Sequence, residues 1–263
     1  MSTPIIPGAE PISITEGTRG AILLLHGYMG TVQTVRDLAR AFARAGFAVE
    51  APLLPGHGTS AEDLATTTWS DYQACVQAAY QQLAARYPRI IVAGLCIGGN
   101  LAAWLAAEYS ATTVGLIDIN GIYKIPHFWN ANAHALDAST RPFIPWKGRG
   151  KGVENPEAEE VIGYDVSPIA TLITVGAGAG EVVGRLAEIR CPVLCFTSMA
   201  SHQFSPEDST FWLKKVSGPV EHVPLPRSNH VATMDYDKDL LEARAVAFAL
   251  AISEGEKVSA ANC

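Results

Sequence analysis

The motif with the clearest chemical meaning is Gly94-Leu95-Cys96-Ile97-Gly98-Gly99, which places a thiol among glycines. An apolar run precedes it and a run of small and apolar residues follows it, so the pattern predicts a buried strand, a sharp turn and a helix. Gly94 and Gly98 lack a Cβ atom and leave room for such a turn. The N–H groups at a helix N-terminus favour a thiolate. We therefore predict that Cys96 is a nucleophile with a lowered pKa.

Alternating strands and helices would position this motif. Short apolar runs predict buried strands at 21–25, 47–51, 89–95, 113–119, 192–198 and 220–225, and amphipathic stretches predict helices at 31–45, 69–86, 100–108, from about 206, and at 238–252. This alternation is typical of α/β proteins, in which helices flank a mostly parallel sheet.

Between 122 and 187 the alternation fails. We expect residues 1–121 and 188–263 to form the core and 122–187 to form a cap, or lid, inserted over it. Within this segment, the stretch 176–180 (GAGAG) lacks the Lys and Ser or Thr that complete a phosphate-binding loop. We expect a flexible turn there.

Composition and charge exclude several classes of protein. Hydrophobic residues make up 48% and charged residues 17%, which provides ample apolar surface for a core. The net charge of −7 argues against nucleic acid as the main partner. We see neither a membrane span nor a signal peptide, and expect a cytoplasmic protein. The five cysteines show no disulfide framework and no metal-ligand spacing, so we expect neither a metal nor a cofactor.

Four further motifs accompany the one at Cys96. They are LLLHGYMG at 23–30, LPGHG at 54–58, CPVL at 191–194 and SNHV at 228–231. In this order they resemble the α/β-hydrolase superfamily, and within it the bacterial carboxylesterases and monoacylglycerol lipases, over nearly the whole chain. The resemblance implies an α/β-hydrolase fold with a cap insertion.

The resemblance also assigns roles to individual residues. It implies a G-x-S-x-G nucleophile turn in which Cys96 replaces the serine. It implies that the backbone N–H groups of Tyr28 and Ile97 form an oxyanion hole, and that His230 is the general base.

The third member of the expected triad is missing. Where the family pattern has an acid, this chain has Ser201, and loss of the acid from a serine triad costs about 10⁴ in turnover. A thiol ionises more readily than a hydroxyl and needs less help, so we interpret Cys96 and Ser201 as one coupled change. Ser201 could orient His230 by a hydrogen bond. Alternatively, Asp118 or Asn120, at the end of the third buried strand, could take the role.

Candidates for substrate binding come from the expected cap and from the loop after Ser201. They are Trp129, Trp146 and His202, although aromatic residues also fit an ordinary core. The basic stretch 147–151 could contact an acyl carrier such as coenzyme A or phosphopantetheine, or could be an exposed charged face.

Together these residues predict acyl-transfer chemistry on a small-molecule ester or thioester, through a covalent acyl-Cys96 intermediate. We favour acyltransferase or condensation chemistry, because a weaker histidine partner activates water poorly. Hydrolysis of the same bond by a carboxylesterase or thioesterase is the alternative. A catalytically degenerate, ligand-binding protein is a second alternative, and a cysteine introduced into a serine enzyme to trap an intermediate is a third.

Overall fold

The protein is built around a seven-stranded sheet. Its structure, a computed structural model, describes residues 3–124, 142–146, 152–202 and 204–255. The strand order is β1-β3-β2-β4-β5-β8-β9, and neighbours are parallel except for β1 with β3. The strands are β1 (Ile12–Ile14), β2 (Ala21–Leu25), β3 (Ala48–Ala51), β4 (Ile90–Leu95), β5 (Thr113–Ile119), β8 (Val193–Ser198) and β9 (Val220–Leu225). A separate antiparallel pair is formed by β6 (Phe143–Pro145) and β7 (Val166–Pro168).

Strands β2, β4 and β5 lie at the centre of the sheet. Every residue of β2 and of β4 is buried, as expected for apolar strands that are covered on both faces. In register, Leu25, Gly94, Asp118 and Cys195 stand side by side on four neighbouring strands. The carboxyl ends of these parallel strands share one edge of the sheet, and Cys96 follows β4 directly at that edge.

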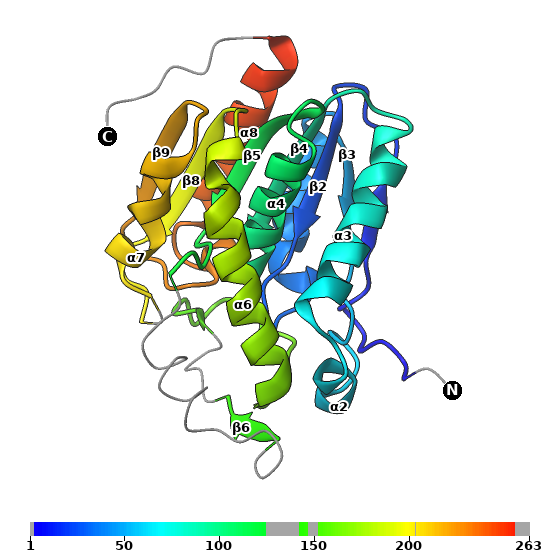
Figure 1. Ribbon diagram of the computed structural model, residues 1–263, viewed down its shortest axis with the longest axis vertical. Helices are drawn as coiled ribbons and strands as arrows, with labels where there is room; N and C mark the ends of the chain where they lie inside the picture. The colour runs from blue at the N-terminus through cyan, green and yellow to red at the C-terminus, as the bar shows by residue number, and fades with distance from the viewer. Residues whose placement is uncertain (1–2, 125–141, 147–151, 203, 256–263) are drawn as a thin grey trace.

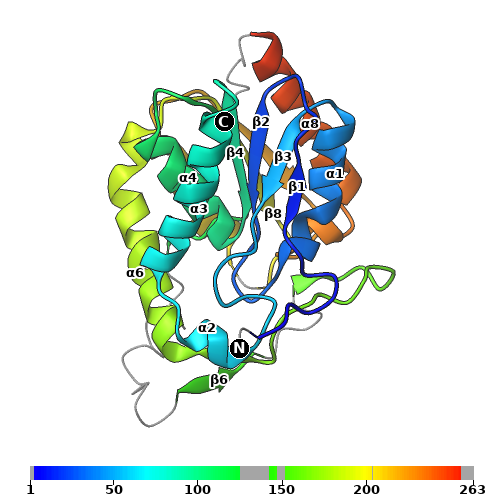
Figure 2. The same ribbon diagram turned by 90° about the vertical axis from the view of Figure 1, so that its right-hand side faces the viewer.

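Helices cover both faces of the sheet (Figures 1 and 2). One layer contains α3 (Trp69–Ala84), α4 (Ile97–Glu108) and α6 (Ile169–Arg185), and the other contains α1 (Arg36–Arg44) and α8 (Lys238–Glu254). The shorter helices are η1 (Val32–Val35), α2 (Ala61–Ala65), η3 (Leu186–Glu188), α7 (Pro206–Thr210), η4 (Phe211–Lys215) and η5 (Ala232–Met234). Because α4 contacts β2, β4 and β5, the helix that begins after Cys96 lies against the centre of the sheet.

The predicted α/β fold is confirmed. Strands β2, β5 and β9 have the predicted bounds, and the other predicted elements shift by a few residues at their ends. The sequence did not indicate β1, α2, β6 or β7, which have three to five residues each and too short a pattern to recognise.

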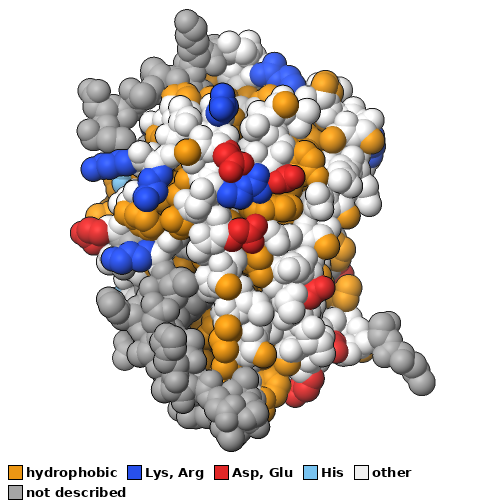
Figure 3. Space-filling model, viewed as in Figure 1, with side chains coloured by type: hydrophobic (Ala, Val, Ile, Leu, Met, Phe, Trp, Pro, Cys, Tyr) orange, Lys and Arg blue, Asp and Glu red, His pale blue; other side chains and the backbone are white. Residues whose placement is uncertain are grey.

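Helix α6 was not predicted either. The stretch 176–180 lies inside it, so the expectation of a flexible turn was wrong. Gly178 shows why glycines occur there, because a Cβ atom at this position would lie 2.1 Å from the ring of Trp69 in α3. By length and composition the helical stretch Ile169–Glu188 could also cross a membrane, but half of it is buried, and α6 packs on α3 and α4. On this face, hydrophobic side chains form small groups between polar and charged ones (Figure 3).

Candidate active site

Cys96 occupies a strained turn between β4 and α4. Its backbone has φ 58° and ψ −124°, and left-handed φ values in a non-glycine residue cost about 1–3 kcal/mol. Its N–H donates to the carbonyl of Ile119 at 2.9 Å, which fixes the turn to β5. A Cβ atom at Gly94 would lie 2.1 Å from the carbonyl of Gly98, and one at Gly98 would lie 2.3 Å from the carbonyl oxygen of Leu25. Both glycines are therefore required by close backbone contacts.

The sulfur of Cys96 contacts two backbone donors. The N–H groups of Ile97 and Tyr28, the two donors predicted for an oxyanion hole, lie close enough to the thiol to lower its pKa. The loop from β2 comes close enough because residue 27 is glycine, where a Cβ atom would lie 3.0 Å from the Cβ of Cys96 and 3.7 Å from its Sγ.

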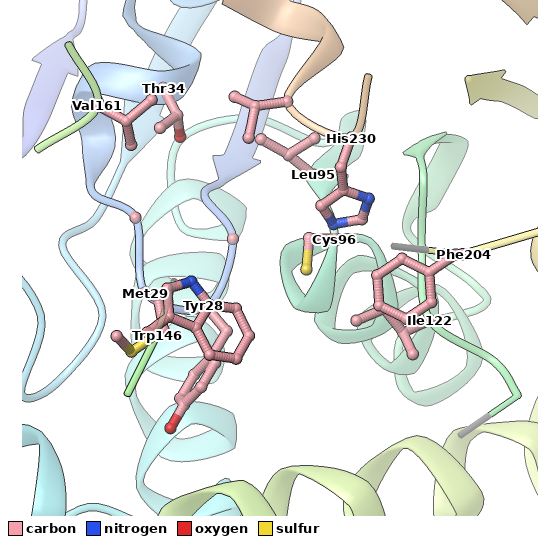
Figure 4. A pocket seen from close by; sticks show the side chains of 13 residues that line it. Tyr28, Met29, Thr34, Leu95, Cys96, Ile122, Trp146, Val161, Phe204 and His230 are labelled. Atoms are coloured by element: carbon pink, nitrogen blue, oxygen red, sulfur yellow. The ribbon is translucent and has the colours of Figure 1, made fainter. Parts of the chain in front are cut away.

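His230 lies beside Cys96 on the loop after β9 (Figure 4). Its backbone is held on both sides, since its N–H donates to Oδ1 of Asn229 at 2.8 Å and its carbonyl accepts from Nδ2 of Asn120 at 2.8 Å. His230 is 4% exposed. Within the described part of the chain, neither nitrogen of its ring has a hydrogen-bond partner. The ring of Phe204 packs on it at 4.8 Å between centroids, tilted by 41°.

Burial determines the protonation of both groups. It raises the pKa of the Cys96 thiol to about 12, although the N–H groups of Ile97 and Tyr28 oppose this effect. It lowers the pKa of His230 to about 4. The predicted lowering of the thiol pKa by the helix N-terminus therefore has the wrong sign, because loss of hydration outweighs two N–H contacts. The resting pair is a neutral thiol and a neutral imidazole.

Both groups open into one pocket. Its lining is mostly apolar and, apart from the two titratable groups and Thr34, consists of Gly27, Tyr28, Met29, Gly30, Leu95, Ile122, Trp146, Val161, Phe204 and Val231. Figure 4 shows the rings of Tyr28 and Trp146 on one side of Cys96, and Phe204 and Ile122 on the other. Such a pocket suits an uncharged, apolar acyl group.

A comparison against known protein families agrees with the fold described above. Residues 16–220 match the family described as "Serine aminopeptidase, S33". The chain belongs to this α/β-hydrolase family.

Individual proteins similar to this α/β-hydrolase support its assignment to the family. The thermostable monoacylglycerol lipase of Bacillus sp. (strain H-257) is 35% identical over 246 residues, which cover 93% of this chain and 96% of that protein. The carboxylesterase of Bacillus subtilis (strain 168) is 25% identical, over 88% of this chain and 92% of that protein. A solved structure from work on the metagenome-derived lipolytic enzymes LipS and LipT has a TM-score of 0.86 and 30% identity, over 94% of this chain and 99% of that one.

The three candidates for the missing acid all lie near the site, but none is hydrogen-bonded to the imidazole. Ser201 accepts from the N–H of Phe204 at 3.3 Å. Asp118 accepts from the hydroxyl of Tyr123 at 2.9 Å. Asn120 binds the backbone of His230, as described above, and its side chain also donates to the hydroxyl of Ser198 at 2.8 Å.

Asp118 is instead enclosed beneath the nucleophile turn. Its carboxylate accepts from the N–H of Gly121 at 3.1 Å and lies 3.9 Å from the thiol of Cys195. A Cβ atom at Gly99, in the first turn of α4, would lie 2.4 Å from its Oδ1. Burial raises the pKa of Asp118 to about 7, and its negative charge contributes to the raised pKa of Cys96.

The predicted substrate-binding residues separate into three cases. Trp146 lines the pocket, with its ring edge-on to that of Tyr28 at 6.2 Å. The side chain of His202 is 72% exposed and pairs with Glu154 at 3.5 Å, and it does not line the pocket. Trp129 and the basic stretch 147–151 lie outside the residues that the structure describes.

Several pocket residues carried no signal in the sequence. Ile122, Val161 and Phe204 reach the pocket from three different segments, and an isolated apolar residue in a loop gives no indication that it faces a ligand. Met29 and Val231 lie inside the motifs at 23–30 and 228–231, but the sequence did not assign them to the pocket. Among the residues that the structure describes, no group of three or more His, Cys, Asp or Glu side chains could hold a metal ion.

Proposed function

We propose that this protein cleaves a carboxylic ester or thioester with an apolar acyl group, through a covalent acyl-Cys96 intermediate. The observation that carries the proposal is the position of Sγ, in contact with the N–H groups of Tyr28 and Ile97 at the head of an apolar pocket. The relatives named as a monoacylglycerol lipase and a carboxylesterase support an ester as the substrate.

The first half of the reaction would begin from the neutral pair. The substrate carbonyl oxygen takes the place of Sγ in the oxyanion hole, and rotation about the Cα–Cβ bond of Cys96 brings the sulfur to the imidazole. His230 accepts the thiol proton as sulfur attacks the carbonyl carbon, and the C=O electron pair becomes an oxyanion bound by the two N–H groups. The oxyanion then collapses, the bond to the leaving group breaks, and the imidazolium protonates the released alcohol or thiol.

The second half of the reaction returns the enzyme. His230 removes a proton from a nucleophile, which attacks the thioester carbonyl and releases Cys96 as a thiolate that the imidazolium reprotonates. With water as the nucleophile the product is a free acid, which is the carboxylesterase or thioesterase reaction.

Acyl transfer to another acceptor is the second candidate function. The observation that favours it is the imidazole without a polar partner, because an unsupported base activates water weakly. A thioester intermediate is more reactive toward amines and thiols than toward water, so these acceptors would compete with hydrolysis. In this version a thioester donor could come from an acyl carrier such as coenzyme A.

Intact-protein mass spectrometry with p-nitrophenyl butyrate tests both candidates. We expect one butyryl group per chain, located on Cys96 by peptide mapping and absent from Cys96→Ala. Cys75→Ala is the matched control, because that thiol is on α3, away from the pocket, and should leave labelling unchanged. Release of free butyrate in water supports hydrolysis, and release only after adding an amine or thiol supports acyl transfer. The absence of both a covalent label and any release of p-nitrophenol above the rate of Cys96→Ala would favour the ligand-binding alternative.

A further inference from the structure

The oxyanion loop, residues 27–31, is held by a segment far away in the sequence, residues 159–168. Gln33 follows the loop in η1 and is 5% exposed. Its Nε2 donates to the carbonyl of Glu160 at 2.9 Å, and its Oε1 accepts from the N–H of Ile162 at 2.8 Å. One side-chain amide therefore satisfies both a donor and an acceptor of the segment's backbone, in the way that a neighbouring strand would.

Two further contacts join the segment to the loop itself. The hydroxyl of Tyr28 shares a hydrogen bond of 3.1 Å with the fully buried hydroxyl of Ser167. A Cβ atom at Gly163 would lie 2.1 Å from the carbonyl oxygen of Met29, so the two backbones are in close contact. Met29 has φ 63°, a conformation that is unfavourable for a non-glycine residue and persists only when its surroundings impose it.

We propose that Gln33 is a positioning residue, which fixes the N–H of Tyr28 in the oxyanion hole by binding the backbone of Glu160 and Ile162. The physical reason is that the strained turn at Met29 lies between that N–H and Gln33, and can relax if either end is released. Since the donor must point at the developing oxyanion, a small rotation of the Tyr28 peptide removes its effect. This inference rests on the proposed function only in calling the two donors an oxyanion hole.

The test compares Gln33→Met with the wild-type protein. Methionine keeps the length and flexibility of the side chain. It removes the hydrogen bonds to Glu160 and Ile162, together with a longer one, of 3.3 Å, from Nε2 to the carboxylate of Glu159. Gln77→Met is the matched control, because Gln77 also donates through Nε2, at 2.8 Å to the hydroxyl of Tyr109, but lies on α3. Tyr28→Phe provides a second, milder variant, which removes the bond to Ser167 and a longer one, of 3.5 Å, to the carbonyl of Pro168.

Two reagents separate the oxyanion hole from the thiol. Butyraldehyde adds reversibly to Cys96: the sulfur bonds to the carbonyl carbon, the thiol proton passes to His230, and the C=O electron pair moves to the oxygen, where the two N–H groups would stabilise it. Iodoacetamide alkylates the same sulfur by displacing iodide, and no oxyanion forms. We expect Gln33→Met to weaken the aldehyde adduct by about ten- to a hundredfold and Tyr28→Phe by a smaller factor. The alkylation rate should fall by a clearly smaller factor than aldehyde binding, because the N–H of Tyr28 also lowers the pKa of the thiol. Gln77→Met should match wild type in both assays.

An unchanged aldehyde affinity in Gln33→Met would overturn the proposal, and so would an equal loss of alkylation and aldehyde binding, which would indicate general damage. If wild type forms no aldehyde adduct, it is the acyl-Cys96 proposal that fails. Deuterium uptake of peptides covering residues 27–35 then still decides the role of Gln33. We expect uptake at least about threefold faster in Gln33→Met than in Gln77→Met, and equal uptake would rule that role out.

Discussion

The two sides of the site differ in how firmly the protein holds them. On the side of Tyr28 and Ile97, the proposed oxyanion donors, the protein has the turn at Cys96, a close approach at Gly27 and the hydrogen bonds that Gln33 makes to residues 160 and 162. On the opposite side, His230 is fixed through its backbone. Its ring packs on Phe204, and its two nitrogens have no hydrogen-bond partner among the residues that the structure describes.

This difference indicates which part of the chemistry the protein supports most. Preorganised donors stabilise the charge that develops on the carbonyl oxygen, and this contribution does not depend on how acidic the nucleophile is. A polar partner for the imidazole matters most when the base must remove a proton from a hydroxyl, and less when the proton comes from a thiol. A cysteine nucleophile therefore suits a site with preorganised N–H donors on one side and an imidazole without a polar partner on the other.

The largest expected effect comes from a nucleophile that depends on His230, the side of the site where the imidazole has no polar partner. Cys96→Ser keeps the turn but replaces the thiol with a hydroxyl, which His230 must deprotonate without a carboxylate to stabilise its charge. We expect the rate of acylation by p-nitrophenyl butyrate to fall by about 10⁴. Stopped-flow release of p-nitrophenol measures this rate. A serine variant within about tenfold of wild type would mean that the imidazole has an effective partner.

The next test gives the imidazole of His230 a carboxylate partner. In the Cys96→Ser background, Ser201→Asp places a carboxylate at the position where the family pattern has an acid. We expect it to recover about a hundredfold in acylation rate, because the carboxylate stabilises the imidazolium. Ser205→Asp in the same background is the control, since it adds the same charge to the same loop at an exposed position. Equal rates for the two double variants would show that residue 201 does not reach the ring.

Local sequence patterns predicted one side of the site better than the other. The turn at Cys96 follows from a short motif, because glycine spacing and a strand-to-helix boundary are properties of neighbouring residues. The donor roles of Tyr28 and Ile97 were implied by the family resemblance and stay a prediction. The surroundings of His230 depend on Phe204 and on the loop after β8, which meet it only in the folded chain. The sign of the thiol pKa was mispredicted for the same reason, since burial is a tertiary property.

A third prediction concerns the electrostatics beneath the nucleophile turn. The charge on Asp118 contributes to the raised pKa of Cys96, so Asp118→Asn should lower that pKa and increase the thiolate fraction, by about tenfold. The rate of iodoacetamide alkylation between pH 7 and pH 9 measures the change. Tyr123→Phe is the control, because it keeps the carboxyl group and removes only the hydroxyl that donates to it. No increase in the alkylation rate of Asp118→Asn would contradict the assignment.

The same substitution has a consequence for stability. The pKa of Asp118 is about 7 in the folded protein, above its ordinary value of 3.8. The folded state therefore binds this proton more tightly than the unfolded state, and the free energy of unfolding should fall as the pH rises from about 4 to about 7. Asp118→Asn removes this contribution. Urea unfolding at pH 5 and pH 8 should show a smaller difference for the variant than for Tyr123→Phe.

The smallest effect is expected from loss of the aromatic contact between Phe204 and His230. Phe204 helps to exclude water from His230, whose pKa burial lowers to about 4. Because the base must be neutral to accept a proton, wild-type acylation should persist down to about pH 4 and decline below it. Phe204→Leu admits more water, raises the imidazole pKa toward 6.5, and moves the acidic limb of the pH–rate profile upward, with about a threefold loss at pH 5. An acidic limb unchanged in Phe204→Leu would show that the rest of the pocket alone keeps the imidazole dry, and that the contact with Phe204 contributes packing only.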